Sequence, residues 1–514
     1  MRRPDLTSKW ERLSRDEIRW LQGKKLARFV REQILPFSAF YREHFKKAGL
    51  DARSIRNVDD LRRIPFISKG DCAPSAADPA RARKLILTPD APTFGRSLSL
   101  AGKARMSLQA LLRGKARVKE QIGREYRPVL FFFTTGRSSD PVAFVLSLYD
   151  LEIMKVVGSR ILQVIGADPA VDRGVNVFPY APHLAFWQVV YCGIAEGLLN
   201  LHTGGGRVMS TDRILTSIEK LRPTLLSGIP GYVYHLLRQG QEQGRDLSSV
   251  RLILLGGDRV SVPQRRKMIE LLTQKGARNP QVLSVYGFTE ARICFPECPA
   301  PVPSGFHIFP DLCIVETIDP ETGDPVAEGE KGEIVYTAID GRGSVVLRYR
   351  TGDIAEGGLV HEPCPHCGRL TPRILGPMSR ASSVVDYRLS KIKGTLVNLD
   401  YLGRVIADQT GVEEWQLVIG KKNNDPLDVD ELVLHLALSE GENEAAVRTE
   451  LENRLRSELE VGVNRFYFHP LAEMLTRIGM ETRLKEERVV DRRNELEEKL
   501  LEAEDKEDMA PRPS

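Results

Sequence analysis

Residues 284–290 are Ser284-Val285-Tyr286-Gly287-Phe288-Thr289-Glu290, and this stretch decides which fold we expect. An apolar run at residues 282–285 precedes the glycine, as in a short buried strand that stops there. An aromatic ring, a hydroxyl and a carboxylate then lie at the carboxyl end of the strand, where open parallel α/β sheets bind ligands. We interpret the stretch as part of a nucleotide site; a tight turn that carries polar residues is the simpler alternative.

Strands and helices alternate along the chain before this stretch. Strands are expected at residues 175–178, 198–201, 224–229 and 250–255, and helices at residues 187–194, 214–221, 232–241 and 263–275, with Thr211-Asp212 as one cap. Repeated βα units of this kind predict a parallel sheet with right-handed crossovers. Gly256-Gly257-Asp258 follows the strand at residues 250–255, so we expect it beside residues 286–290 at one edge of the sheet.

Another polar loop follows the apolar run at residues 129–133. It begins Thr134-Thr135-Gly136-Arg137, and hydroxyls, a glycine and a cation suit a loop that holds phosphate through backbone N–H groups. A solvent-exposed turn uses the same residue types, so the loop alone does not distinguish the two. After residue 305, strands expected at residues 313–318, 332–337 and 345–349 indicate a mostly antiparallel subdomain before Arg350-Thr351-Gly352-Asp353.

The length of 514 residues exceeds one ordinary domain. We predict an α/β fold: a large N-terminal domain of parallel βα sheets with a small β-rich subdomain, followed by a smaller α/β domain. The expected boundaries are residues 1–380 for the first domain and residues 381–495 for the second. Residues 496–514 are a charged, proline-containing tail that we expect to be disordered.

The composition gives no sign of several classes of partner. Hydrophobic residues at 42% and charged residues at 28% are typical of a soluble globular protein. The 74 basic and 69 acidic side chains leave a net charge of only +5, which gives no argument for nucleic acid or a membrane as partner. Neither an apolar signal region nor a membrane-spanning run is found, so a cytoplasmic location is expected. A homodimer is one candidate assembly.

Five motifs occur in order: Thr134-Thr135-Gly136, Gly256-Gly257-Asp258, and residues 286–290, 349–353 and 485–493. Together they resemble the adenylate-forming superfamily of acyl-CoA synthetases, and specifically its phenylacetate-CoA ligase-like branch. The resemblance extends from about Tyr41, through residues 64–69, to Arg493. It implies an N-terminal AMP-binding domain and a mobile C-terminal domain.

The resemblance also implies a reaction. ATP activates a carboxylic acid to an acyl-adenylate, and the acyl group passes to a thiol, usually that of coenzyme A. Tyr286 would lie against the adenine, Thr289 would contact the α-phosphate, and Glu290 would hold Mg²⁺. Cation and lysine are needed because a carboxylate attacks a polyphosphate, and the charge that develops must be neutralised.

Other residues receive roles by the same resemblance. Asp353 would bind the ribose hydroxyls, since a carboxylate accepts two hydroxyl hydrogen bonds, with Arg380 nearby. Lys485, on the C-terminal domain, would bridge the carboxylate and the phosphate. The remaining expected nucleotide contacts are Thr134, Thr135, Gly136, Gly256, Gly257, Asp258 and Gly287. Tyr180, His183 and Trp187 lie where the family has its acyl pocket, which indicates an aryl or otherwise apolar acid.

Two departures from the family pattern leave the function open. Arg137-Ser138-Ser139-Asp140 stands before Pro141 in the phosphate loop, and Arg380 is followed by Ala381-Ser382-Ser383 where the family has acidic residues. One alternative is adenylation with transfer to an amine or a protein thiol. Another is a catalytically degenerate relative that binds a nucleotide or a partner protein.

Four residues suggest a structural zinc site. Cys364 and Cys367 form a C-x-x-C, which supplies two thiolates from one turn, and Cys298 and His307 complete a set suited to tetrahedral Zn²⁺. Members of the resembling family also bind zinc at similar positions. His366 or Cys294 are alternative ligands, and unliganded cysteines are the alternative to a metal.

Overall fold

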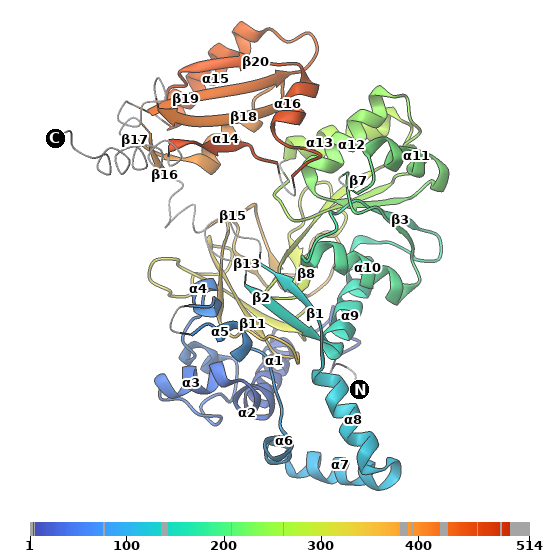
Figure 1. The fold of residues 1–514 in the computed structure, drawn as a ribbon, viewed down its shortest axis with the longest axis vertical. Coiled ribbons are helices and arrows are strands. Elements are labelled where there is room, and N and C mark those ends of the chain that lie inside the picture. Colours follow the sequence, from blue (N-terminus) through green and yellow to red (C-terminus); the bar gives the residue numbers. More distant parts are fainter. Residues whose placement is uncertain are drawn as a thin grey trace, which may run out of the picture. The chain divides into compact units, whose positions relative to one another are not determined.

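The computed structural model describes residues 4, 6–75, 78–134, 142–206, 208–260, 262–380, 389–392, 395–421, 430–459, 461–483 and 486–493 (Figure 1). The chain divides into two compact units, Met1–Ser379 and Arg380–Ser514. The tail expected to be disordered, residues 496–514, lies outside the described residues.

A six-stranded sheet forms the centre of the first unit. Its order is β4-β3-β5-β6-β7-β8, and every neighbouring pair is parallel except β7 and β8. The strands are β3 (Arg173–Asn176), β4 (Leu199–His202), β5 (Leu225–Gly228), β6 (Leu252–Leu255), β7 (Gln281–Phe288) and β8 (Ile293–Pro296). The predicted α/β class with a parallel sheet is confirmed.

Helices alternate with these strands. They are α9 (Leu148–Ile165), α10 (Leu184–Glu196), α11 (Thr211–Leu221), α12 (Pro230–Glu242) and α13 (Val262–Gln274). Strands β5 and β6 are buried along their whole length, as apolar parallel strands covered on both faces are. Ser210 occupies the N-cap position of α11, so the cap lies one residue before the predicted Thr211-Asp212.

A β-rich region follows the central sheet. It contains a four-stranded sheet of order β10-β11-β12-β15 and a three-stranded sheet of order β13-β14-β9. The strands are β9 (Phe306–His307), β10 (Cys313–Ile318), β11 (Gly332–Ala338), β12 (Tyr349–Ala355), β13 (Leu359–Val360), β14 (Arg373–Ile374) and β15 (Met378–Arg380). The prediction of a strand at residues 345–349 is wrong. The strand β12 begins at Tyr349 and runs through Arg350-Thr351-Gly352-Asp353, because Tyr349 pairs with Tyr336 of β11 and bridges to Ile67.

The first part of the chain is mainly helical. Its elements are α1 (Arg15–Phe29), η1 (Val30–Ile34), α2 (Leu35–Phe37), α3 (Ala39–Lys47), η2 (Asp59–Arg63), α4 (Lys69–Cys72), α5 (Arg81–Lys84), α6 (Ala91–Ser97), α7 (Leu100–Arg113) and α8 (Lys115–Tyr126). Ser68 caps α4 through a capping box with Asp71. The antiparallel pair β1 (Pro128–Phe133) and β2 (Ala143–Ser147) then leads into α9.

The second unit is a small α/β domain with its own apolar core. Its larger sheet has the order β20-β19-β18-β21, and a hairpin of β16 and β17 precedes it. The elements are β16 (Leu389–Ile392), β17 (Thr395–Asn398), α14 (Leu399–Ala407), β18 (Val412–Lys421), β19 (Asp430–Leu438), α15 (Glu444–Leu459), β20 (Arg465–Phe468), α16 (Leu471–Arg477) and β21 (Val489–Asp491).

Candidate active site

The turn after β7 carries the polar residues that the sequence singles out. The strand does not stop at Gly287 as predicted but continues to Phe288, because β8 returns beside it and pairs Gly287 with Cys294. A Cβ atom on Gly287 would lie 2.6 Å from Cys294 Sγ and 3.0 Å from the carbonyl oxygen of Ile293. Only glycine fits this close approach, and Thr289 and Glu290 follow immediately at the end of the strand.

Tyr286 and Asp353 meet although they are 67 residues apart in the chain. The Tyr286 hydroxyl donates a 2.8 Å hydrogen bond to Asp353 Oδ2. Asp353 lies on β12 directly after Gly352, whose φ of +71° favours glycine. Its side chain is buried, and its backbone N–H donates to Thr351 Oγ1. The aromatic ring and the carboxylate assigned to adenine and ribose are therefore neighbours.

Glu290 is held by a second tyrosine. The Tyr349 hydroxyl donates to Glu290 Oε1 at 2.5 Å, and Glu290 is only 8% exposed. Burial raises the pKa of Tyr349 well above its usual value, and the charge of Glu290 adds to this, so the hydroxyl stays protonated as a donor. Burial, followed by the charge of Glu290, also raises the pKa of Cys72 to about 12. Cys72 belongs to α4, so this short N-terminal helix lies near Glu290.

The strand β1 ends at Phe133, next to Thr289. Thr289 Oγ1 donates to the carbonyl oxygen of Phe133 at 3.3 Å, and His183 Nδ1 lies 3.1 Å from that oxygen. The next residue, Thr134, is buried and accepts a 3.0 Å hydrogen bond from the backbone N–H of Val142. Thr135 and Gly136 of the predicted phosphate loop lie outside the described residues.

Gly256 lies beside β7, as predicted. Its backbone N–H donates to Gly228 of β5, and an added Cβ would lie 3.2 Å from Val285 Cγ1 and 3.6 Å from the ring of Phe178. Gly257 has a φ of +81°, and Asp258 Oδ1 accepts from the N–H of Arg259. The glycine pair therefore brings backbone close to the carboxyl end of β7.

An aromatic cluster lies where the acyl pocket is expected. The ring centroids of Tyr180 and Trp187 are 6.0 Å apart, and Phe186 is within 5.6 Å of both. Tyr180 is 63% exposed, whereas Phe186 is buried. His183 occupies the N-cap position of α10, which carries the other two aromatic residues. The backbone of Arg380 belongs to β15, and Lys485 lies outside the described residues.

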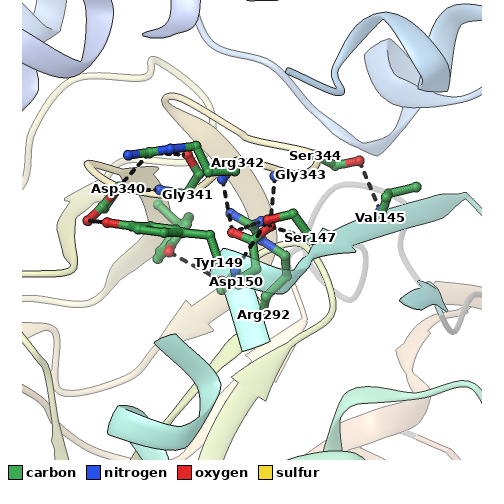
Figure 2. A network of polar contacts seen from close by, with 12 residues as sticks. Val145, Ser147, Tyr149, Asp150, Arg292, Asp340, Gly341, Arg342, Gly343 and Ser344 are labelled. Carbon is green, nitrogen blue, oxygen red and sulfur yellow. Dashed lines mark hydrogen bonds and ion pairs between the residues drawn. The ribbon is translucent and has the colours of Figure 1, made fainter. Parts of the chain in front are cut away.

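Asp150 is the hub of a buried network that sequence reasoning missed (Figure 2). It accepts hydrogen bonds from the Ser147 N–H at 2.8 Å, the Ser147 hydroxyl at 2.9 Å and the Gly343 N–H at 2.7 Å. It also accepts from the Arg342 N–H at 3.0 Å and pairs with Arg292 Nη1 at 2.9 Å. These contacts connect the end of β2, the turn two residues after Glu290, and the loop at residues 341–343.

Tyr149 extends this network. Its hydroxyl donates to Asp340 Oδ2 at 2.8 Å, and the guanidinium of Arg342 lies 4.2 Å from its ring centroid. Only one local signal of the network was available in the sequence: Ser147 and Asp150 have the spacing of a capping box, which the start of α9 uses.

Three cysteines and a histidine form a separate cluster. The ligand atoms of Cys298, His307, Cys364 and Cys367 all lie within 4.8 Å of one another. The Cys298 and Cys364 sulfurs are 3.7 Å apart, as are the Cys367 sulfur and His307 Nε2. His307 Nδ1 lies 3.0 Å from the Thr371 hydroxyl, which orients the ring. Within the described residues, the cluster does not include the alternatives Cys294 or His366.

Residues 74–344, just over half of the chain, match the AMP-binding enzyme family. The chain belongs to this family. It is 26% identical over 442 residues to phenylacetate-coenzyme A ligase of Thermus thermophilus, and the aligned region covers 84% of this chain and 83% of that protein. It is 24% identical over 423 residues to phenylacetate-coenzyme A ligase of Aromatoleum evansii, at 79% and 76% coverage.

A solved structure has the same fold as this AMP-binding enzyme. The 2-hydroxyisobutyryl-CoA ligase in its postadenylation state matches with a TM-score of 0.71 and 18% identity, over 97% of this chain and 94% of that chain. The resemblance to the phenylacetate-CoA ligase-like branch is confirmed, and with it the prediction of an enzyme of the acid–thiol ligase class.

Proposed function

We propose that this AMP-binding enzyme joins a carboxylic acid to coenzyme A in two steps. The acid's carboxylate oxygen attacks the α-phosphorus of ATP and pyrophosphate leaves; the thiol sulfur then attacks the acyl carbon and AMP leaves. One observation carries the proposal: two tyrosines hold two buried carboxylates, Asp353 and Glu290, at the carboxyl end of β7. The family match supports ATP as the activating nucleotide.

The two carboxylates would have different roles. A carboxylate has about four acceptor positions, so Asp353 can accept from two ribose hydroxyls while it accepts from Tyr286. Glu290 offers the oxygen ligand that Mg²⁺ prefers, and its low exposure fits a site from which water is largely excluded. A bound Mg²⁺ would neutralise charge on the phosphates.

Three further groups complete the proposed site. The Thr289 hydroxyl, held at the end of β1, would contact the α-phosphate. Gly256 and Gly257 would let the nucleotide approach the backbone. Lys485 would neutralise charge between the acid and the α-phosphate during adenylation. The residues that depart from the family pattern, 137–140 and 381–383, lie outside the described residues.

The acid is proposed to be aryl or otherwise apolar. The aromatic cluster of Tyr180, Phe186 and Trp187 lies close in sequence to His183, the N-cap residue of α10. His183 Nδ1 in turn contacts the carbonyl oxygen of Phe133. Aromatic and aliphatic side chains favour an apolar acyl group, whereas a second charged group on the acid would lose hydration without a partner there. Relatives named phenylacetate-coenzyme A ligase support the same class of acid.

The acyl acceptor can be tested by following AMP release and free thiol together. With an accepted acid, ATP and Mg²⁺, we expect coenzyme A to accelerate AMP release and to lose one thiol for each AMP formed. If pyrophosphate exchange occurs but coenzyme A does not accelerate turnover, the acceptor is an amine or a protein thiol. The control omits the acid, and no thiol should then be consumed.

A structural zinc ion is proposed on Cys298, His307, Cys364 and Cys367. Two sulfurs about 2.3 Å from one ion at tetrahedral angles lie about 3.8 Å apart, and a sulfur and a nitrogen about 2.1 Å from the ion lie about 3.6 Å apart. Both values are close to the 3.7 Å separations of the Cys298–Cys364 and Cys367–His307 pairs. The donor set of three sulfurs and one imidazole nitrogen also suits Zn²⁺. Cys298 and Cys364 are buried, which fits a closed site without an open position for substrate.

Removing two ligands tests the zinc proposal. Protein purified without chelator should contain about one zinc ion per chain by elemental analysis. Cys364→Ser with Cys367→Ser should remove the metal and lower the melting temperature, because metal binding contributes to folding free energy. Cys192→Ala, at a buried cysteine outside the cluster, should keep the zinc. Wild-type protein without zinc would contradict the proposal.

A further inference from the structure

Helix α7 has no buried residue. At about 100° per residue, its leucines share one stripe about 120° wide with Ala101 and Ala104. The exposed fractions are 86% for Leu100, 55% for Leu108, 82% for Leu111 and 72% for Leu112. In Figure 1, α7 lies at the lower end of the first unit, between α6 and α8. Its apolar face is therefore left without a partner within the described residues.

Cations surround this leucine stripe. Lys103 and Arg105 lie on either side of it on the helical wheel. The exposed cations of α7 and α8 are Lys103, Arg105, Arg113, Lys115, Arg117, Lys119 and Arg124. None of the seven forms an ion pair with a described residue, and Glu120 is the one exposed acid of the two helices. These two helices, residues 100–126, are called the α7–α8 hairpin below, and they combine exposed leucines with a net positive charge.

We propose that the α7–α8 hairpin binds the surface of an anionic lipid bilayer. Interfacial helices have this composition: leucines enter the boundary of headgroups and acyl chains, and lysine and arginine lie against anionic headgroups. Protein interfaces are typically anchored by aromatic side chains, and residues 100–113 contain none. A second copy of the hairpin would bring like charges together.

The association is peripheral. No helix among the described residues is long and apolar enough to cross a membrane. The net charge of the whole chain, +5, does not reveal this local positive charge, because acidic residues elsewhere balance the cations of the hairpin. The proposal does not depend on the identity of the acid.

Vesicle co-sedimentation of the full chain tests the proposal. We expect binding to phosphatidylcholine vesicles that contain phosphatidylglycerol, and much weaker binding to phosphatidylcholine alone. Leu108→Glu with Leu111→Glu should lower the partition coefficient at least about tenfold, because the charged side chains cannot enter the apolar boundary. Lys115→Glu with Lys119→Glu should weaken binding at low salt and remove most of its salt dependence.

Matched controls separate lipid binding from misfolding. Val171→Glu changes an apolar side chain that is 68% exposed elsewhere, and it should bind like wild type. The variants should keep their circular dichroism spectra and pyrophosphate exchange, since α7 and α8 hold no residue of the proposed active site. The proposal fails if wild type does not bind anionic vesicles at low salt, or if the leucine variant binds unchanged. It also fails if that variant instead abolishes self-association in a chain that ignores vesicles.

Discussion

Glu290→Gln is expected to lower acid-dependent ATP–pyrophosphate exchange about 10²–10³-fold, the size of effect seen when one group that stabilises transition-state charge is removed. Glutamine keeps the size of the side chain and an oxygen that accepts from the Tyr349 hydroxyl. It loses the negative charge that would hold Mg²⁺. Exchange is measured at saturating ATP while Mg²⁺ is varied, and the variant should also need more Mg²⁺.

Two further variants serve as comparisons for Glu290→Gln. Tyr349→Phe keeps the Glu290 carboxylate but removes its 2.5 Å donor, so we expect a loss of about tenfold. Glu321→Gln, at an exposed position in the β-rich region, should leave exchange unchanged. If Glu290→Gln exchanges at a rate within about twofold of wild type, the carboxylate does not have the proposed role.

Asp150→Asn is expected to lower the free energy of unfolding by about 3–5 kcal/mol, because it leaves the buried cation of Arg292 without its acid. The substitution also weakens the hydrogen bonds that the backbone N–H groups of Arg342 and Gly343 donate to this side chain, because an amide oxygen is a weaker acceptor than a carboxylate. Urea unfolding of the whole chain, followed by tryptophan fluorescence, measures the change.

The same substitution at an exposed ion pair provides a matched control. Asp246 pairs with Arg222 at 2.5 Å on the surface, and Asp246→Asn should cost no more than about 1 kcal/mol. In a double-mutant cycle, Arg292→Gln should recover part of the loss from Asp150→Asn, since no buried cation then remains unpaired. A cost at Asp150 no larger than at Asp246 would show that the network does not hold the fold.

The apolar run at residues 250–255 correctly predicted where β6 ends, and that was enough to place Gly256 beside β7. The run at residues 282–285 did not predict that β7 continues to Phe288, because this extension depends on pairing with β8. The strand at Tyr349–Ala355 was missed for the same reason: its partners, Tyr336 and Ile67, are distant in the chain. Local patterns record which faces are apolar but not which strand supplies the hydrogen bonds.

The contacts of the candidate site show a similar limit. The family motifs identified Tyr286, Glu290 and Asp353 one by one. They did not predict the hydrogen bonds Tyr286–Asp353 and Tyr349–Glu290, which join residues 67 and 59 positions apart in the chain. Asp150 was overlooked because a capping acid appears ordinary until the tertiary structure brings Arg292 to it. The exposed leucine stripe of α7 was not predicted, because an apolar stripe in a sequence does not show whether another element covers it.

We propose that the chain activates a carboxylic acid with ATP through an acyl-adenylate. The most direct test is ATP–pyrophosphate exchange with wild-type protein and Mg²⁺ across a panel of aryl, aliphatic and charged carboxylic acids. We predict exchange that requires the acid, is strongest with aryl or other apolar acids, and does not require coenzyme A. Absence of exchange with every acid, together with no binding of ATP by calorimetry, would contradict the account.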